Sequence, residues 1–174
     1  VASLIIAGIH AYLGLHVVER GVIFVDLSLA QIASLGAAIG VFIGLEPHDP
    51  SIYWLSLGFT LIGALIFALI KGQEVGIPQE AIIGISYAVA SAAVILVMSQ
   101  STGESEHLRD MLVGNILSVQ WTEVWITAAV YVVIGVFHYF YRKRFLEISL
   151  DAAGVSARGI SVRFWDFLFY ASFG

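Results

Sequence analysis

The sequence has 174 residues, of which 59% are apolar and only 12% are charged, and its formal net charge is −5. Soluble domains carry about 25% charged residues, and a chain of this size has too little interior to hide so much apolar surface. The composition therefore excludes a soluble enzyme and a disordered regulator. The acidic balance excludes a nucleic-acid binder, and the lack of cysteine excludes disulfides and thiolate metal sites. An all-α, polytopic transmembrane helical bundle remains.

Five stretches are long and apolar enough to cross a bilayer, which takes about 20 residues of helix. In chain order they are residues 1–18, 22–45, 53–70, 81–99 and 124–141, and a sixth begins near residue 164. We expect about six spans, in a single transmembrane domain over residues 1–174. Because the ends of the sequence cut the first and last runs, we expect a fragment that is truncated at its C-terminal end and at its N-terminus.

The basic residues are divided unevenly between the connecting segments. If the first span runs from outside to inside, seven of the eight Lys and Arg side chains lie in inner segments and only Arg109 lies outside. Inner segments of membrane proteins carry such an excess. The sequence therefore predicts a multi-pass protein of this orientation, with residues 107–119 forming a short helix at the outer face.

Three glycines recur every four residues along the second span. Gly36, Gly40 and Gly44 would lie on one face of a regular helix. Small residues on such a face let a second helix approach closely, which is how membrane helices pack. We interpret all three as helix-packing residues.

Asp26 is the one charged residue of the second span. A carboxylate at the centre of a membrane helix costs about 2.5–3.5 kcal/mol and less near an edge, and such residues usually face a water-filled path or a partner. Two interpretations stay open: a ligand on a cation path, or an inner-interface carboxylate paired with Arg20 or a lysine. Gln31 follows five residues on, about 140° around the helix, so a bend would be needed for both to touch one ion.

Histidines lie in several spans, where neutral imidazole is a good ligand for Zn²⁺ or Mn²⁺. His10 and His16 are six residues apart, so they do not form the i, i+4 pair of a helical zinc site. A lone membrane histidine more often makes a hydrogen bond between helices, and both interpretations stay open for His16 and His138. The sequence contains no His-Glu-x-x-His motif, which argues against a zinc peptidase.

The two lysines rule out a Walker A loop, which needs Gly-Lys followed by Ser or Thr. Lys71 stands between Ile70 and Gly72, and Lys143 stands between two arginines. ATP-driven activity would therefore require another chain.

The longest inner segment, residues 147–163, mixes charged and small residues, and Asp151 is placed to cap a short helix there. Such a helix would dock on a soluble partner or serve as a simple polar connection.

Four pieces of the sequence resemble, in family order, the permease subunits of ABC-type zinc, manganese and iron importers. Residues 14–40 are similar to the second-span region of that family, and residues 80–99 to its acidic-Ala-x-Ile-Gly-Ile segment. Residues 107–119 are similar to its Leu-x-x-x-Leu-x-Gly-x-Ile-Leu piece, and residues 151–166 to the loop that forms its coupling helix. The family has about eight spans, so the resemblance implies that further spans follow the truncated sixth.

The resemblance implies a metal path through the second span. The family shows Asp-x-x-x-His there; Asp26 matches the aspartate, but Ala30 stands four residues on, and Gln31 takes the place of the histidine only if Gly36 is aligned. The resemblance thus implies Asp26 as a pathway ligand and Gln31 as a weaker one. The missing imidazole leaves the choice of metal open, because nitrogen ligands favour zinc and oxygen ligands favour manganese. Candidates that would compensate for it, without family support, are His16, Glu19 and Glu80.

For the inner loop, the resemblance implies a coupling helix against the ATPase, with Asp151, Ala153, Ala157 and Gly159 as its residues. It also implies a homodimer of permease subunits, separate ATP-binding subunits, an extracytoplasmic metal-binding protein and the lipid of a prokaryotic inner (plasma) membrane, with no nucleic acid. Zn²⁺ or Mn²⁺ would be the transported substrate. The subunit would hold no permanent cofactor and perform no covalent chemistry.

The sequence thus favours the permease subunit of an ATP-driven divalent metal importer, and two alternatives remain. A passive channel or an ion-coupled secondary carrier would use the same Asp26 and histidines without an ATPase. An ABC permease for iron chelates or cobalamin would bind its cargo outside the membrane and would not need Asp26.

Overall fold

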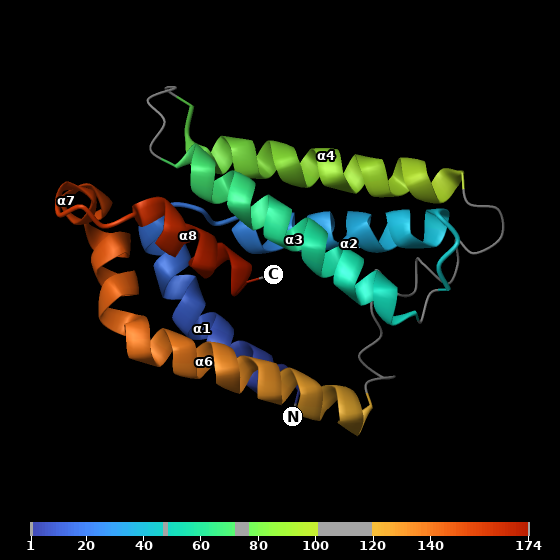
Figure 1. Ribbon diagram of the computed structural model, residues 1–174, viewed down its shortest axis with the longest axis horizontal. Helices are drawn as coiled ribbons and strands as arrows, with labels where there is room; N and C mark the ends of the chain where they lie inside the picture. Colours follow the sequence, from blue (N-terminus) through green and yellow to red (C-terminus); the bar gives the residue numbers. More distant parts are fainter. Residues whose placement is uncertain (1, 47–48, 72–76, 101–119, 174) are drawn as a thin grey trace. The chain divides into compact units, whose positions relative to one another are not determined.

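The computed structural model describes residues 2–46, 49–71, 77–100 and 120–173, and within these ranges every regular element is a helix. This confirms the all-α prediction. The helices are α1 (Ala2–Arg20), α2 (Val25–Phe42), α3 (Pro50–Ile70), α4 (Gln79–Ser99), α6 (Trp121–Leu150), α7 (Ala152–Ala157) and α8 (Val162–Ala171) (Figure 1).

Four helices in the described part of the chain, α2, α3, α4 and α6, are long and apolar enough to cross a membrane. They coincide with four of the five complete spans that the sequence predicts. The first predicted span is also a helix, α1, of 19 residues, although it is not among these four. The expected count of six spans is therefore approximate. The outer helix predicted for residues 107–119 lies outside the described residues.

The helices group into two compact units. Unit 1 comprises Val1–Gly21 and Asn115–Trp165, and so contains α1, α6 and α7. Unit 2 comprises Val22–Gly114 and Asp166–Gly174, and so contains α2, α3, α4 and the larger part of α8.

In unit 1, α1 packs against α6 through aromatic and apolar side chains. The Tyr12 ring meets the rings of His16 and His138 edge to face, and His138 stacks on Phe145 with 4.3 Å between ring centroids. Leu13, one turn below His16 on α1, is fully buried. Aromatic pairs of this geometry add to the burial of their own surface, so they hold the two helices together.

In unit 2, α2 packs against both α3 and α4. On the α4 side, the buried Ser28 donates a hydrogen bond from Oγ to the carbonyl of Ile83 at 3.1 Å. On the α3 side, Ala37 and Val41 of α2 pack against Ile52. The helix that carries Asp26 is thus enclosed on two sides by its neighbours.

Gly36 and Gly40 lie at the contact between α2 and α3. A Cβ atom on Gly36 would lie 2.9 Å from the Cα of Ser56, and one on Gly40 would lie 3.2 Å from Ile52 Cγ1. The backbones therefore approach more closely than a side chain at Gly36 would allow, as in other small-residue helix contacts. Gly63 of α3 belongs to the same contact, because a Cβ there would lie 2.9 Å from Ile32 Cδ1.

Gly44 does not share this face. It lies beyond the last residue of α2 and is exposed, with no atom within 4 Å of a Cβ built on it. Its φ of +95° is one that residues with a side chain rarely adopt. The four-residue spacing therefore ends with the helix, and Gly44 serves its termination rather than packing.

We expect Gly36→Ala to lower the free energy of unfolding by about 1–3 kcal/mol, the usual cost of overpacking a tight contact. The added methyl group would meet backbone at Ser56, which cannot rotate away. Gly58→Ala is the matched control, because nothing lies within 4 Å of a Cβ at that helical position and alanine favours a helix over glycine by up to about 1 kcal/mol. Thermal unfolding in detergent measures both, and equal shifts for the two variants would contradict the close approach.

The turn before α3 is fixed by its own cap. Asp49 precedes Pro50, and its Oδ1 accepts a hydrogen bond from the backbone N–H of Ser51 at 2.7 Å. Hydrogen bonds from Ser51 hold the pKa of the Asp49 carboxyl below its usual range. Because a capping carboxylate satisfies a free N–H of the first turn, this short sequence sets where α3 begins.

Candidate functional site

Asp26 is the second residue of α2 and is exposed. Its carboxylate makes no ion pair or hydrogen bond with the residues that the structure describes. The interpretation in which Asp26 is neutralised by a basic partner therefore finds no support in the described ranges. A carboxylate in this state is available to a cation.

Glu80, in the first turn of α4, reaches the same end of α2. Its Oε1 accepts a hydrogen bond from the backbone N–H of Phe24 at 2.9 Å. Phe24 is the N-cap residue of α2 and supplies no side-chain cap itself, so Glu80 provides the cap from a neighbouring helix. The other oxygen, Oε2, is buried and has no hydrogen-bond partner among the described residues. Glu80 thus has a structural contact and one spare oxygen near the start of α2.

Gln31 lies on a different face of α2 from Asp26. The helix is continuous from Val25 to Phe42, so it has no break that would turn the two side chains toward one ion. Gln31 is half-buried, whereas Asp26 is exposed. In the described part of the chain, no three His, Asp or Glu side chains are grouped closely enough to hold a metal ion. A site for a dehydrated ion is therefore not complete within the described residues.

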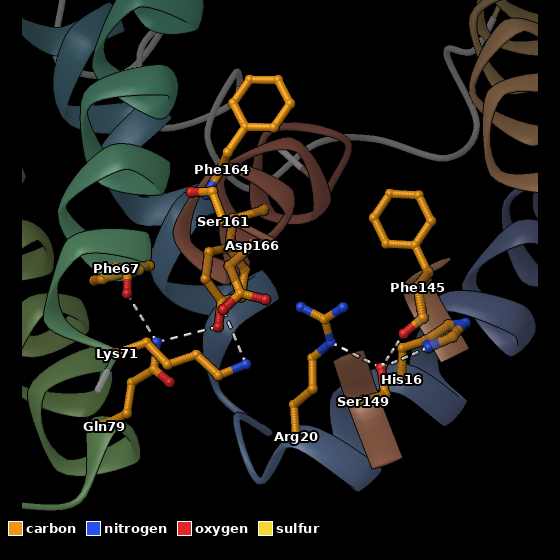
Figure 2. Close-up of polar contacts among 11 residues, drawn as sticks. His16, Arg20, Phe67, Lys71, Gln79, Phe145, Ser149, Ser161, Phe164 and Asp166 are labelled. Atoms are coloured by element: carbon orange, nitrogen blue, oxygen red, sulfur yellow. Dashed lines mark hydrogen bonds and ion pairs between the residues drawn. The ribbon is translucent and has the colours of Figure 1, made fainter. Parts of the chain in front are cut away.

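His16, in unit 1, makes a contact between helices. It is buried, and its Nδ1 lies 2.8 Å from Oγ of Ser149 on α6. The same Oγ donates to the carbonyl of Phe145 at 2.9 Å and accepts from Nε of Arg20 at 2.9 Å (Figure 2). The Nδ1 atom of His16 is therefore engaged in a contact between α1 and α6.

Glu19, the other compensating candidate in unit 1, is exposed near the end of α1. The structure brings it into no cluster with His16 that would hold a metal ion, within the residues it describes. The four candidates His16, Glu19, Asp26 and Glu80 are therefore divided between the two units, and only Asp26 and Glu80 lie near one helix end.

A cavity of about 440 Å³ between α1 and α6 is a feature that the sequence interpretation missed. Its walls are mainly apolar and aromatic, and they are formed by Gly8, Ile9, Tyr12, Gly135, His138, Tyr139 and Arg142. Gly8 and Gly135 leave the space open because neither has a side chain. The Arg142 guanidinium lies 4.6 Å above the Tyr139 ring. These mainly apolar walls offer few ligands to a hydrated cation. The one sequence signal for the cavity was the presence of glycine on both facing helices, at Gly8 and Gly135.

The inner segment forms the predicted short helix, α7. Asp151 caps it, with Oδ1 accepting a hydrogen bond from the backbone N–H of Gly154 at 2.8 Å, which confirms the expected helix start. Val155 is buried, while Ala153 and Ala157 are exposed. The helix therefore has one face turned to its own unit and a smooth exposed face of small side chains.

An exposed ion pair ties the end of α7 to α6. Arg158, just after α7, places a guanidinium nitrogen 3.4 Å from Oε2 of Glu147 on α6, and Arg144 of α6 places one at the same distance. Gly159 follows with a φ of +77°, which favours glycine. A side chain at Gly159 would strain the backbone itself, so its role in the turn is separate from any surface role.

Comparison with known proteins identifies related membrane transport proteins. The model of the ABC 3 transport family matches residues 1–174. Manganese import system permease protein ScaB of Streptococcus gordonii is 24% identical over 168 residues, which is 97% of this chain and 58% of that protein. Manganese transport system membrane protein MntC of Listeria innocua is 25% identical over 165 residues, which is 94% of this chain and 56% of that protein.

A solved structure shares the fold. PsaBC from Streptococcus pneumoniae in complex with Fab matches with a TM-score of 0.73 and 25% identity, over 99% of this chain and 60% of that chain. The chain thus spans less than two thirds of the length of the proteins it matches.

Proposed function

The chain belongs to the ABC 3 transport family, and on this basis we propose that it is part of the permease subunit of an ATP-driven importer of divalent metal ions. The observation that carries the proposal is the family match over the whole of residues 1–174. A multi-pass helical membrane protein suits such a role, as does the Asp26 carboxylate at a helix start, which has no ion pair or hydrogen bond with the described residues.

Manganese is the cargo we favour, with zinc as the alternative. One relative is named as a permease protein of a manganese import system and another as a membrane protein of a manganese transport system. The candidate ligands Asp26 and Gln31 offer oxygen, which suits Mn²⁺ better than zinc. In this proposal Asp26 binds the passing ion and Gln31 contributes weakly from another face of α2. His16 and Glu80 already make hydrogen bonds through Nδ1 and Oε1, so they support the helices around the path. The ion is the transported substrate, and the subunit has no resident cofactor.

The partners follow from the same proposal. Two copies of the permease line the path, separate ATP-binding subunits hydrolyse ATP, and an extracytoplasmic protein delivers the metal. The exposed face of α7, with Ala153 and Ala157, docks on the ATP-binding subunit. The chain lies in a prokaryotic plasma membrane as one permease domain, with α1 running from outside to inside, because that orientation puts most basic residues inside.

Uptake of radioactive metal into proteoliposomes tests the proposal. The full-length permease is reconstituted with its ATP-binding subunit and delivery protein, and Mn²⁺ and Zn²⁺ are supplied with and without ATP. We expect uptake that requires ATP, with Mn²⁺ preferred. Uptake without ATP would replace the importer with a channel or a secondary carrier, and uptake of Zn²⁺ alone would change the cargo.

The exposed face of α7 provides a second test of the same distinction. We expect Ala157→Asp to lower ATP-dependent uptake at least about tenfold, because a buried unpaired charge at an interface costs more than the 1.4 kcal/mol that a tenfold loss represents. Thr122→Asp is the matched control, since it adds the same charge to the exposed first turn of α6. A passive channel would tolerate both changes equally. Substitution of Gly159 is less informative, because its positive φ makes any side chain strained.

A further inference from the structure

A buried ion pair ties α8 to the end of α3 within unit 2. The Nζ of Lys71, the residue that follows α3, lies 2.9 Å from Oδ2 of Asp166 on α8. The Asp166 side chain is 0% exposed and that of Lys71 is 19% exposed, and Figure 2 shows the two charged groups directed toward each other. Each charge has lost water to reach this position, so the pair persists only while both partners are held in place.

A second tie joins the same elements through one amide. Gln79, the first residue of α4, donates from Nε2 to the carbonyl of Phe67 on α3 at 2.8 Å and to Oη of Tyr170 on α8 at 3.1 Å. The buried rings of Phe67 and Tyr170 also meet edge to face, with 6.4 Å between centroids. We call these three residues, together with Lys71 and Asp166, the α3–α8 junction.

The α3–α8 junction resists opening. Separating Lys71 from Asp166 would leave a buried carboxylate without its cation, which is strongly destabilising. Gln79 would lose its bond to Tyr170, leaving a buried polar group unsatisfied. Elements joined in this way move as packed bodies rather than deform continuously.

The junction also follows closely on α7 along the chain. Residues 158–161 alone separate the end of α7 from the start of α8, and Asp166 lies in the second turn of α8. A displacement of α7 thus has a short covalent route to α8. From α8 the junction leads to α3, against which α2 packs, and α2 carries Asp26.

We propose that the α3–α8 junction makes α8 and α3 one rigid body and so transmits movement of α7 to the helix that carries Asp26. Lys71 and Asp166 act as positioning residues: they touch no cargo. The inference rests on the proposed function, because it assigns the route by which ATP-driven movement reaches the metal path. The junction stays closed throughout transport, and its loss uncouples ATP hydrolysis from uptake.

Asp166→Asn tests this role, because it removes the buried charge and keeps the side-chain shape. The matched control is Glu46→Gln, the same kind of change at an exposed carboxylate beyond the end of α2 that belongs neither to α7 nor to the α3–α8 junction. Manganese uptake and ATP hydrolysis are measured together on the full-length permease with its ATP-binding subunit. We expect Asp166→Asn to lower the metal taken up per ATP by roughly fivefold or more, the lower end of usual coupling effects, while Glu46→Gln keeps the wild-type ratio.

The ratio separates coupling from stability. A variant that is only less stable loses uptake and hydrolysis in proportion, and an unchanged ratio in Asp166→Asn would overturn the proposal. Should Asp166→Asn fail to accumulate, Tyr170→Phe removes only the hydroxyl that accepts from Gln79. We expect the metal taken up per ATP to fall in this variant too, by a smaller factor. An unchanged ratio would overturn the proposal.

Hydrogen exchange of the backbone amides of residues 166–171 tests whether α8 stays fixed to α3, and it needs no transported metal. We expect equal protection in the nucleotide-free and ATP-bound wild-type complexes, and reduced protection in Asp166→Asn. Loss of protection in the wild type on ATP binding would show that the junction opens, which overturns the proposal. Because this measurement needs no metal, its result remains readable even if the wild type shows no ATP-driven uptake, the outcome that would end the proposed function.

Discussion

Replacing Asp26 with alanine is expected to lower ATP-dependent manganese uptake by roughly 100-fold or more, because loss of even a supporting residue costs a metal site 10–100-fold. Asp26 is exposed on the first turn of α2 and makes no ion pair with the described residues. Its removal therefore leaves no charged partner behind, and the fold should be unaffected. Hydrolysis of ATP should continue. Metal uptake and ATP hydrolysis in proteoliposomes measure the two effects.

Two variants provide controls for Asp26→Ala. Asp26→Glu keeps a carboxylate and should retain part of the uptake. Glu46→Ala removes an exposed carboxylate beyond the other end of α2 and should behave as wild type. ATP-dependent uptake that survives in Asp26→Ala would keep the importer but place its metal path elsewhere.

The single substitution Lys71→Met is expected to lower the free energy of unfolding by about 3–5 kcal/mol, the cost of removing one partner from a buried ion pair. Asp166 has a fully buried side chain, and Lys71 Nζ lies 2.9 Å from its carboxylate. For a domain of this size that loss corresponds to a fall in melting temperature on the order of 10 °C. Thermal unfolding of the purified full-length permease in detergent measures it.

The double variant Lys71→Met/Asp166→Leu distinguishes charge from packing. Replacement of a whole buried ion pair by apolar residues is often neutral or stabilising, so we expect the double variant to unfold near the wild-type temperature. Arg144→Met, which removes a cation from an exposed pair with Glu147, should change the stability by no more than about 1 kcal/mol. A double variant as unstable as Lys71→Met would mean that packing, not the lone charge, causes the loss.

The helices could be predicted from the sequence better than their ends. Runs of apolar residues located α2, α3, α4 and α6, because the bilayer requires their length and composition. Helix α6 nevertheless continues to Leu150, past the predicted end at Tyr141. The charges of Arg142, Lys143 and Arg144 end the apolar run, but they do not end a helix, since arginine and lysine are good helix formers.

The candidate site was predictable only where one residue was conspicuous by itself. Asp26 could be singled out as a charge in an apolar helix, and Asp151 as a cap. The ion pair of Lys71 with Asp166 and the bond of His16 to Ser149, 133 residues away, could not, because no local pattern records which distant residues meet. The role of Glu80 as a cap for α2 was hidden for the same reason.

The contact between Glu80 and Phe24 also determines the electric field at the start of α2. It shows that α2 and α4 begin at the same place, and each helix start carries about half a positive charge from its aligned peptide dipoles. These two ends alone would repel a cation. One carboxylate about balances them, and the second, with Asp26 and Glu80 both present, makes the start of the two helices negative rather than positive.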